Sequence, residues 1–562
     1  MTSTVLAATF TPTTDPVGGS LLASALVALI PLIVFFVMLG VLRLKAYVSA
    51  LGALAAALLV AVIAFGMPAP LALLSATQGA AFGLFPILWI VITAIWLYEL
   101  TVISGRMDDV RATFSAVGRG DMRVQAMLIA FCFGALLEAL AGFGAPVAIT
   151  GAMLLALGLP PIRSAMIALV ANTAPVAFGA MAIPITTAGN LTQIPPAEIA
   201  GVVGHQTPFL ALFVPTLLLY IADGRRGVRE AWPVAAVTGL VFAILQWWAS
   251  NYFAYELTDV IASLGAFAAA VVMLRWWRPT TPDEQRSHVV DAGRDLTPER
   301  VILGLLPYWL VVIIFGIGKL WRVGVDVPAA LASTDVKVQW PGLYGNLLAA
   351  DGAPSPSAVY TFQWLSSPGT MLLITGLIVT VVYSFARDRG RAPITIGQGI
   401  GAFFRTVRDM WRAILTIATV LALAYVMNQS GQTTTIGTWM AATGGLFAFL
   451  SPILGWLGTA VTGSDTSSNA LFAKLQQTAG IQAGIDPHLL VAANSSGGVV
   501  GKMISPQNLT IAAAAINRPA AEPELLRRVI GYSIVMLLFL CVLVYLQSTP
   551  VLGWMIASAG GR

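Results

Sequence analysis

The fold of this chain is set by the segment Gly455–Asn508, whose first polar run reads Gly463-Ser464-Asp465-Thr466-Ser467-Ser468-Asn469. Its second polar part reads Asn494-Ser495-Ser496-Gly497-Gly498 and continues with Gly501-Lys502-Met503-Ile504-Ser505-Pro506-Gln507-Asn508. Both runs interrupt apolar sequence that requires a membrane. Polar, glycine-rich backbone is tolerated at that depth only where protein buries it or where it lines a cavity. Asp465 and Lys502 are therefore candidates for a functional site.

A weaker copy of this segment lies upstream. Gly142-Phe143-Gly144-Ala145-Pro146 aligns with the run that starts at Gly463, and Ala171-Asn172-Thr173 aligns with Ala493-Asn494-Ser495. The offsets of the two alignments differ by a single residue, which indicates an internal duplication. In transporters built this way, the broken segments of the two halves meet at a shared site near the bilayer midplane.

The composition identifies a membrane protein. Of 562 residues, 58% are hydrophobic and only 10% are charged, and the mean hydropathy is +0.85. Many apolar runs reach the ~20 residues that a spanning helix needs. The basic residues cluster in short loops, which is the positive-inside pattern, so the net charge of +5 does not indicate nucleic-acid binding.

No pattern of an enzyme or an ATP-driven pump is present in the sequence. The histidines His205, His288 and His488 are scattered and lack metal-ligand spacing. No Walker A pattern occurs. We therefore expect no catalytic residues, no metal site and no cofactor.

The predicted fold is an all-α polytopic membrane protein. We expect about 12 transmembrane helices plus two re-entrant hairpins, arranged as an inverted repeat with broken helices. The hairpins are predicted at 124–158 and 436–480, broken at Gly142–Pro146 and Gly463–Ser467. The first segment would instead be one long kinked helix if Arg163, which follows it, were not cytoplasmic. The broken helices are predicted at 164–190 and 488–515, interrupted at Asn172–Pro175 and Asn494–Gly498. The basic residues of the loops place the beginning of the first copy on the cytoplasmic side and the beginning of the second copy outside. The two copies are therefore predicted to be inverted relative to each other.

The chain divides accordingly into scaffold and core segments. In order, these are N-terminal scaffold helices 1–123, a first inverted-repeat core 124–206, scaffold helices 207–318 with a cytoplasmic loop 278–300, an extracytoplasmic segment 319–367, scaffold helices 368–435, a second inverted-repeat core 436–526 and a C-terminal helix 527–562.

The run after Gly463 predicts an anion site. Ser464, Thr466 and Ser467 are good N-cap residues for a half-helix beginning near Ser468. The amides and dipole at such a helix start favour a bound anion. Asp465 would repel an anion unless it is protonated, holds a cation or pairs with Lys502, and each option couples the anion to a positive charge. The alternative is a purely structural Asp that caps a buried helix.

The charged candidates break the internal symmetry, as expected of a site for one asymmetric ligand. Their counterparts in the other copy are uncharged: Ala180 for Lys502, Gly144 for Asp465 and Thr459 for Glu138. Lys502 could pair with a substrate carboxylate, or its side chain could reach to the membrane interface. Glu138 could carry a proton, or it could be a satisfied structural carboxyl.

Uncharged polar residues complete the predicted site. Asn172, Thr173, Asn494 and Ser495 suit a hydroxyl and a carboxylate or a sodium ion, and they could equally serve helix–helix hydrogen bonds. The predicted proton-coupling residues are Asp465 and Glu138. The predicted substrate-binding residues are Gly142, Gly144, Asn172, Thr173, Ser464, Thr466, Ser467, Asn494, Ser495 and Lys502.

Long motifs in both halves resemble the signature of the L-lactate permease family, which includes glycolate permeases. They are residues 134–149, Asn172–Met181 with Ile183-Pro184, Val461–Asn469 and Ala492–Gln507. The resemblance implies a secondary transporter that carries lactate and glycolate with protons into a bacterial cell. It implies a small monocarboxylate substrate, a multi-pass location in the inner (plasma) membrane, no nucleic-acid partner and no enzyme activity. A wider superfamily analogy suggests elevator-like motion and a homodimer.

Rival functions stay open at this point. The first is a sodium-coupled carrier of carboxylates or dicarboxylates. Two substrate carboxylates usually pair with more than one cationic side chain, whereas only Lys502 lies in a broken motif. A channel is the second, and the paired breaks favour alternating access over it. A membrane enzyme is the third, and it lacks a catalytic cluster.

Overall fold

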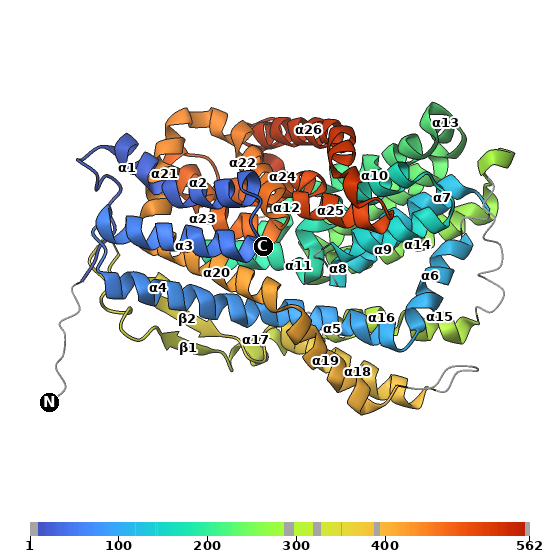
Figure 1. Cartoon of the computed structure of the whole chain (residues 1–562), viewed down its shortest axis with the longest axis horizontal. Coiled ribbons are helices and arrows are strands. Elements are labelled where there is room, and N and C mark those ends of the chain that lie inside the picture. Colours follow the sequence, from blue (N-terminus) through green and yellow to red (C-terminus); the bar gives the residue numbers. More distant parts are fainter. Residues whose placement is uncertain are drawn as a thin grey trace.

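The computed structural model describes residues 9–117, 120–140, 142, 144–285, 297–317, 327–349, 351–386 and 394–556. These residues form an elongated bundle in which α3, α4 and α26 lie along the long axis (Figure 1). Ten helices among them are long and apolar enough to cross a membrane, or eleven when the bent pair in 161–192 counts as one span. The prediction of a polytopic helical membrane protein is confirmed, whereas the count of twelve spans is not.

The elements are bounded as follows. The first part contains α1 (Leu21–Ala28), α2 (Ile30–Phe36), α3 (Ala46–Ile63), α4 (Ala69–Phe82), α5 (Trp89–Ile103), α6 (Arg106–Val117), α7 (Met122–Met127), α8 (Gly134–Leu140), α9 (Ala145–Ala156), α10 (Pro161–Ala171), α11 (Gly179–Thr192) and α12 (Pro196–Val203). The middle contains α13 (Thr207–Tyr252), α14 (Thr258–Trp276), α15 (Pro298–Gly304), α16 (Leu306–Ile317), α17 (Val327–Ala332), β1 (Val336–Gln339), β2 (Val359–Phe362) and α18 (Pro368–Phe385). The last part contains α19 (Ile396–Asp409), α20 (Trp411–Gln429), α21 (Gln432–Met440), α22 (Phe447–Thr462), α23 (Asp465–Ala483), α24 (Pro487–Gly501), α25 (Pro506–Ala515) and α26 (Glu522–Gln547).

A helical hairpin is present at each of the two predicted places, and its re-entrant character stays a prediction. In the first, α9 packs back on α8 and on the helical segment Leu128–Phe133. In the second, α22 ends at Gly463, whose φ of +76° is left-handed, and α23 packs back along α22. The half-helix expected near Ser468 begins earlier, at Asp465, because the Ser464 hydroxyl accepts the Ser467 N–H at 3.2 Å and caps it.

The first broken helix is confirmed, and the second is broken at a different place. α10 and the helical segment after it are bent by 61° around Asn172–Pro175. α24, in contrast, runs unbroken through Asn494–Gly498, so the predicted interruption there is wrong. The break falls at residues 502–505, because Pro506 forces extended backbone on Ser505, whose ψ is 140°.

The two halves therefore share one element order, a helical hairpin followed by a bent helix. They meet where α11 of the first half packs against α23 and α24 of the second. In Figure 1 these elements occupy the centre of the bundle. The inversion of the two halves and the division into scaffold and core segments stay predictions.

The segment predicted at 319–367 departs from the all-α expectation. β1 and β2 form an antiparallel pair with Val336 opposite Phe362, as the β-branched and aromatic residues there favour. The pair lies against the end of α4, where Gln78 Nε2 donates to the Ser357 carbonyl at 2.9 Å. The Tyr360 hydroxyl donates to the Phe85 carbonyl at 2.7 Å. Residues 319–326 and 350 of this segment, and 286–296 of the predicted loop 278–300, lie outside the described residues.

A buried arginine fixes the start of the first hairpin. Arg123 follows the N-cap Asp121, and its side chain is fully buried. The guanidinium donates to Asp121 at 2.8 Å, to Asp223 at 3.1 Å and to Glu230 at 2.7 Å. It also donates to the Thr280 carbonyl at 2.9 Å. Arg123 thus ties the hairpin to α13 and to the segment after α14.

We expect Arg123→Met to destabilise the fold by about 3 kcal/mol, because removing one partner leaves buried carboxylates without their cation. Thermal unfolding of the purified protein in detergent measures the loss. The matched control is Arg229→Met, since the Arg229 side chain is 81% exposed. An equal shift in both variants would show that the buried network does not anchor the hairpin.

Candidate functional site

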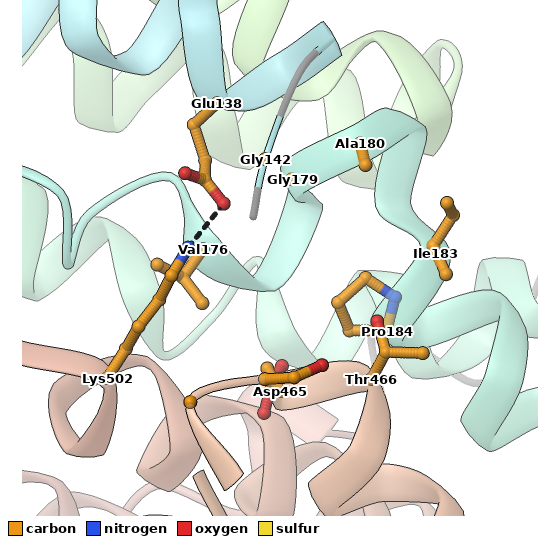
Figure 2. A pocket seen from close by; sticks show the side chains of 12 residues that line it. Glu138, Gly142, Val176, Gly179, Ala180, Ile183, Pro184, Asp465, Thr466 and Lys502 are labelled. Atoms are coloured by element: carbon orange, nitrogen blue, oxygen red, sulfur yellow. Dashed lines mark hydrogen bonds and ion pairs between the residues drawn. The ribbon is translucent and has the colours of Figure 1, made fainter. Parts of the chain in front are cut away.

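A cavity of about 40 Å³ lies where the two halves meet. By volume it has room for a few water molecules. Figure 2 shows first-half residues on one side and second-half residues on the other. The first half contributes Glu138, Gly142, Val176, Gly179, Ala180, Ile183 and Pro184, and the second contributes Gly463, Ser464, Asp465, Thr466 and Lys502.

An ion pair joins the two halves across this cavity. Lys502 Nζ donates to Glu138 Oε1 at 2.6 Å, and the two side chains are only 7% and 4% exposed (Figure 2). The other carboxylate oxygen of Glu138 accepts from Asn172 Nδ2 at 2.9 Å, at the bend after α10. Lys502 therefore does not reach to an interface, and its partner is Glu138 rather than Asp465.

Asp465 also lines the cavity, at the first position of α23. It is 3% exposed, and its Oδ1 accepts from Thr459 Oγ1 at 3.4 Å. Its Oδ2 is buried and has no hydrogen-bond partner among the described residues. No ion pair of Asp465 is recorded in the described part of the chain, although Lys502 lies close enough to interact with its carboxyl electrostatically.

A hydrogen-bond network that joins α23, α24 and α11 lies next to Asp465. Asn494 Nδ2 donates to Asn469 Oδ1 at 2.9 Å, and Asn469 Nδ2 donates to Ser495 Oγ at 2.6 Å. Asn469 Nδ2 also donates to the Pro184 carbonyl of the first half at 3.2 Å. Since Asn494 and Ser495 do not line the cavity, their role here is to join α23, α24 and α11.

The other predicted residues divide between the cavity and its surroundings. Gly142, Ser464 and Thr466 line it. Asn172 does not line the cavity itself, but its side-chain amide donates a hydrogen bond to Glu138, which does. Thr173 donates to the Val170 carbonyl at 2.7 Å and, with Asn172 and Lys502, lines a second, narrow space.

Two further predicted residues lie away from the cavity lining. Gly144 precedes α9 and packs beside Ile511 of α25. Ser467 lies in the first turn of α23, where its backbone N–H donates to the capping hydroxyl of Ser464.

The sequence interpretation missed part of the site. The cavity wall of Val176, Ile183 and Pro184 is apolar and carries no sequence signal of its own. Ala180, Met181 and Ala182 turn the chain around the cavity with left-handed backbone, which costs strain and concentrates at functional sites.

Two buried polar residues near the site were also missed. Asn508 adjoins Lys502 and has a buried Oδ1 without a described partner. Asp259 is completely buried in α14, with Gln246 Nε2 donating to it at 3.3 Å. The rule for charged residues inside apolar segments could have found Asp259.

Comparison with known proteins assigns the chain to a family. The family model described as L-lactate permease matches residues 24–551. The chain belongs to the L-lactate permease family. It is 41% identical to the L-lactate permease of Bacillus subtilis (strain 168), over 96% of this chain and 98% of the relative. It is also 41% identical to the glycolate permease GlcA of Escherichia coli (strain K12), over 98% of this chain and 100% of the relative.

Among solved structures, the chain aligns with the Alcanivorax borkumensis YdaH transporter at a TM-score of 0.47 and 17% identity, covering 86% of this chain and 88% of the other. Membership of the L-lactate permease family, together with the apolar helices, identifies a multi-pass membrane protein and points to a transporter rather than an enzyme.

Proposed function

We propose that this protein imports lactate, glycolate and other small 2-hydroxymonocarboxylates by proton symport, with alternating access, across the inner (plasma) membrane of a bacterial cell. The family and the names of its relatives support the substrate class. The single observation that carries the coupling is the buried pair of Lys502 and Glu138 between the two halves.

This pair makes substrate and proton interdependent. In the empty site Lys502 is neutralised by Glu138. A substrate carboxylate needs the same ammonium group, so it competes with Glu138. Protonation of Glu138 removes that competitor and frees Lys502 for the substrate.

Charge balance in the buried site then links the transport of the substrate to the transport of the proton. The pair of Lys502 with Glu138 is neutral, and so is the pair of Lys502 with a bound carboxylate once Glu138 is protonated. Substrate alone or proton alone would leave one additional charge in a buried site, which is costly unless it is paired. We therefore assign the transported proton to Glu138. Asp465 is the other predicted coupling residue, but no ion pair of Asp465 with a cation is recorded in the described structure that a substrate carboxylate could replace.

The test is uptake of radiolabelled L-lactate and glycolate into proteoliposomes, with an imposed pH gradient and without sodium. The proposal expects accumulation that a protonophore abolishes. Accumulation that requires added sodium would replace the proton by sodium as the coupling ion. If neither substrate enters under either condition, the substrate assignment is wrong.

One glycine is expected to be essential for this site. Gly498 of α24 faces the Asp465 carboxyl, and an added Cβ would collide with Asp465 Oδ1 and lie 2.7 Å from Thr459 Oγ1. Gly498→Ala must therefore displace Asp465 or separate α24 from α22, and we expect lactate uptake to fall about tenfold or more. Gly531→Ala in α26 is the matched control, because a Cβ there meets nothing within 4 Å. Equal uptake by the two variants would contradict the close packing at Asp465.

A further inference from the structure

We propose that Asp465 recognises the 2-hydroxyl group of the substrate while Lys502 holds its carboxylate. This inference rests on the proposed function and adds a residue that determines specificity. It starts from the positions of the two polar side chains in one cavity. Lys502 and Asp465 both line it, with the apolar residues Val176, Ile183 and Pro184 also in its wall (Figure 2).

The orientation follows from hydrogen-bonding chemistry. An ionised substrate carboxylate only accepts hydrogen bonds, so it pairs with an ammonium group and not with another carboxylate. Lys502 is the cationic side chain in the described lining of the cavity. The substrate's second polar group, the hydroxyl on the next carbon, is then left for the other charged residues of the lining.

Asp465 fits that hydroxyl better than Glu138 does. In the empty site Glu138 uses one oxygen for Lys502 and the other for Asn172, and once the substrate displaces Lys502 the freed oxygen carries the transported proton. Asp465 has one buried oxygen, Oδ2, for which no partner is recorded in the described structure. A buried polar atom without a partner is costly and rare in native proteins, so its presence beside a cavity indicates a ligand group that completes it.

A substrate hydroxyl group can form a hydrogen bond with Asp465 Oδ2 whether the carboxyl is ionised or protonated. It donates to the carboxylate and accepts from the carboxylic acid. A methylene group at the same position can do neither, so binding propionate would leave Asp465 Oδ2 buried without a partner. The site should therefore discriminate lactate from propionate, two molecules that differ only in this hydroxyl.

The surroundings hold the carboxyl in place for this role. Thr459 of α22 donates to Oδ1, and Ser495 of α24 adjoins the carboxyl while its hydroxyl accepts from Asn469. Gly498 leaves the space that the carboxyl occupies. The helices α22, α23 and α24 of the second half thus together position the Asp465 carboxyl at the cavity.

The experiment compares L-lactate and propionate as competitors of labelled lactate uptake, or as uptake substrates, in the same proteoliposomes. We expect the unmodified protein to prefer lactate by about 10- to 100-fold, the range for one hydrogen bond to a charged group. Asp465→Ala should reduce the preference to nearly none, through weaker lactate recognition and unchanged propionate recognition. Thr510→Val, which alters an exposed hydroxyl on α25, is the control and should keep the original preference.

The outcomes separate this inference from the proposed function. If the unmodified protein does not transport lactate, the proposed function fails. If it does, and Asp465→Ala keeps the preference or loses both substrates equally, only the role of Asp465 is overturned. Asp465→Asn provides a second test should the alanine variant not fold: we expect a preference lowered several-fold, because an amide forms a weaker hydrogen bond than a charged group. An asparagine variant that keeps its preference and loses proton-driven accumulation would make Asp465 a proton carrier instead.

Discussion

Glu138→Gln is expected to abolish accumulation of lactate driven by a pH gradient while leaving lactate exchange across the membrane intact. The amide has nearly the shape of the protonated acid, so it leaves Lys502 free for the substrate in every step. It cannot return to the charged form that neutralises Lys502 in the empty carrier, so the return of the empty carrier is blocked. We expect net uptake to fall about 100-fold or more, in line with an isolated charge in a low-dielectric site.

Two assays on the same proteoliposomes measure this effect. Net uptake is followed with an inward proton gradient, and exchange is followed with unlabelled lactate inside. Glu524→Gln on α26 is the control, because that carboxylate is exposed and pairs only with the exposed Arg528 in the described structure. A Glu138→Gln protein that still concentrates lactate against its gradient would refute the role of Glu138 as the proton carrier.

Lys502→Met is expected to abolish both net uptake and exchange, because it removes the cation that we assign to the substrate carboxylate. It also leaves Glu138 buried beside Asn172 with no counter-ion. Breaking a buried pair on one side costs about 3–5 kcal/mol, so the single variant should unfold at a lower temperature than the unmodified protein.

The double variant Glu138→Gln with Lys502→Met separates these two effects. With both charges gone, no unpaired ion is buried, so most of the lost stability should return while transport stays absent. Lys337→Met in the exposed strand β1 serves as the control for loss of a lysine. Wild-type transport by Lys502→Met would show that the substrate binds elsewhere.

Much of this arrangement could be predicted from local sequence. Glycine-rich runs inside apolar segments, polar only in the second half, indicated both hairpins, since such backbone has few places to lie in a membrane. The same runs contained Asp465, Lys502 and Ser464, which the structure places at one cavity. Glu138 was predicted on the rule for intramembrane carboxylates.

Other features depended on contacts that sequence does not record. The pairing of Lys502 with Glu138 joins residues from opposite halves of the chain, and the sequence allowed Asp465 as the partner instead. The break in the second bent helix was placed at Asn494–Gly498 because polar residues and glycines disfavour helix. In the fold, Asn494 bonds to Asn469 on a neighbouring helix, and the proline at 506 ends the helix instead.

The central claim, that each lactate enters with one proton exchanged at Glu138, is tested most directly by measuring both fluxes together. Lactate is added outside lightly buffered proteoliposomes, and external alkalinisation is recorded alongside uptake of labelled lactate. The account predicts one proton taken up for each lactate, without sodium and with no net charge movement, and no proton uptake by the Glu138→Gln variant. Lactate uptake without alkalinisation, or equal proton uptake by that variant, would contradict it.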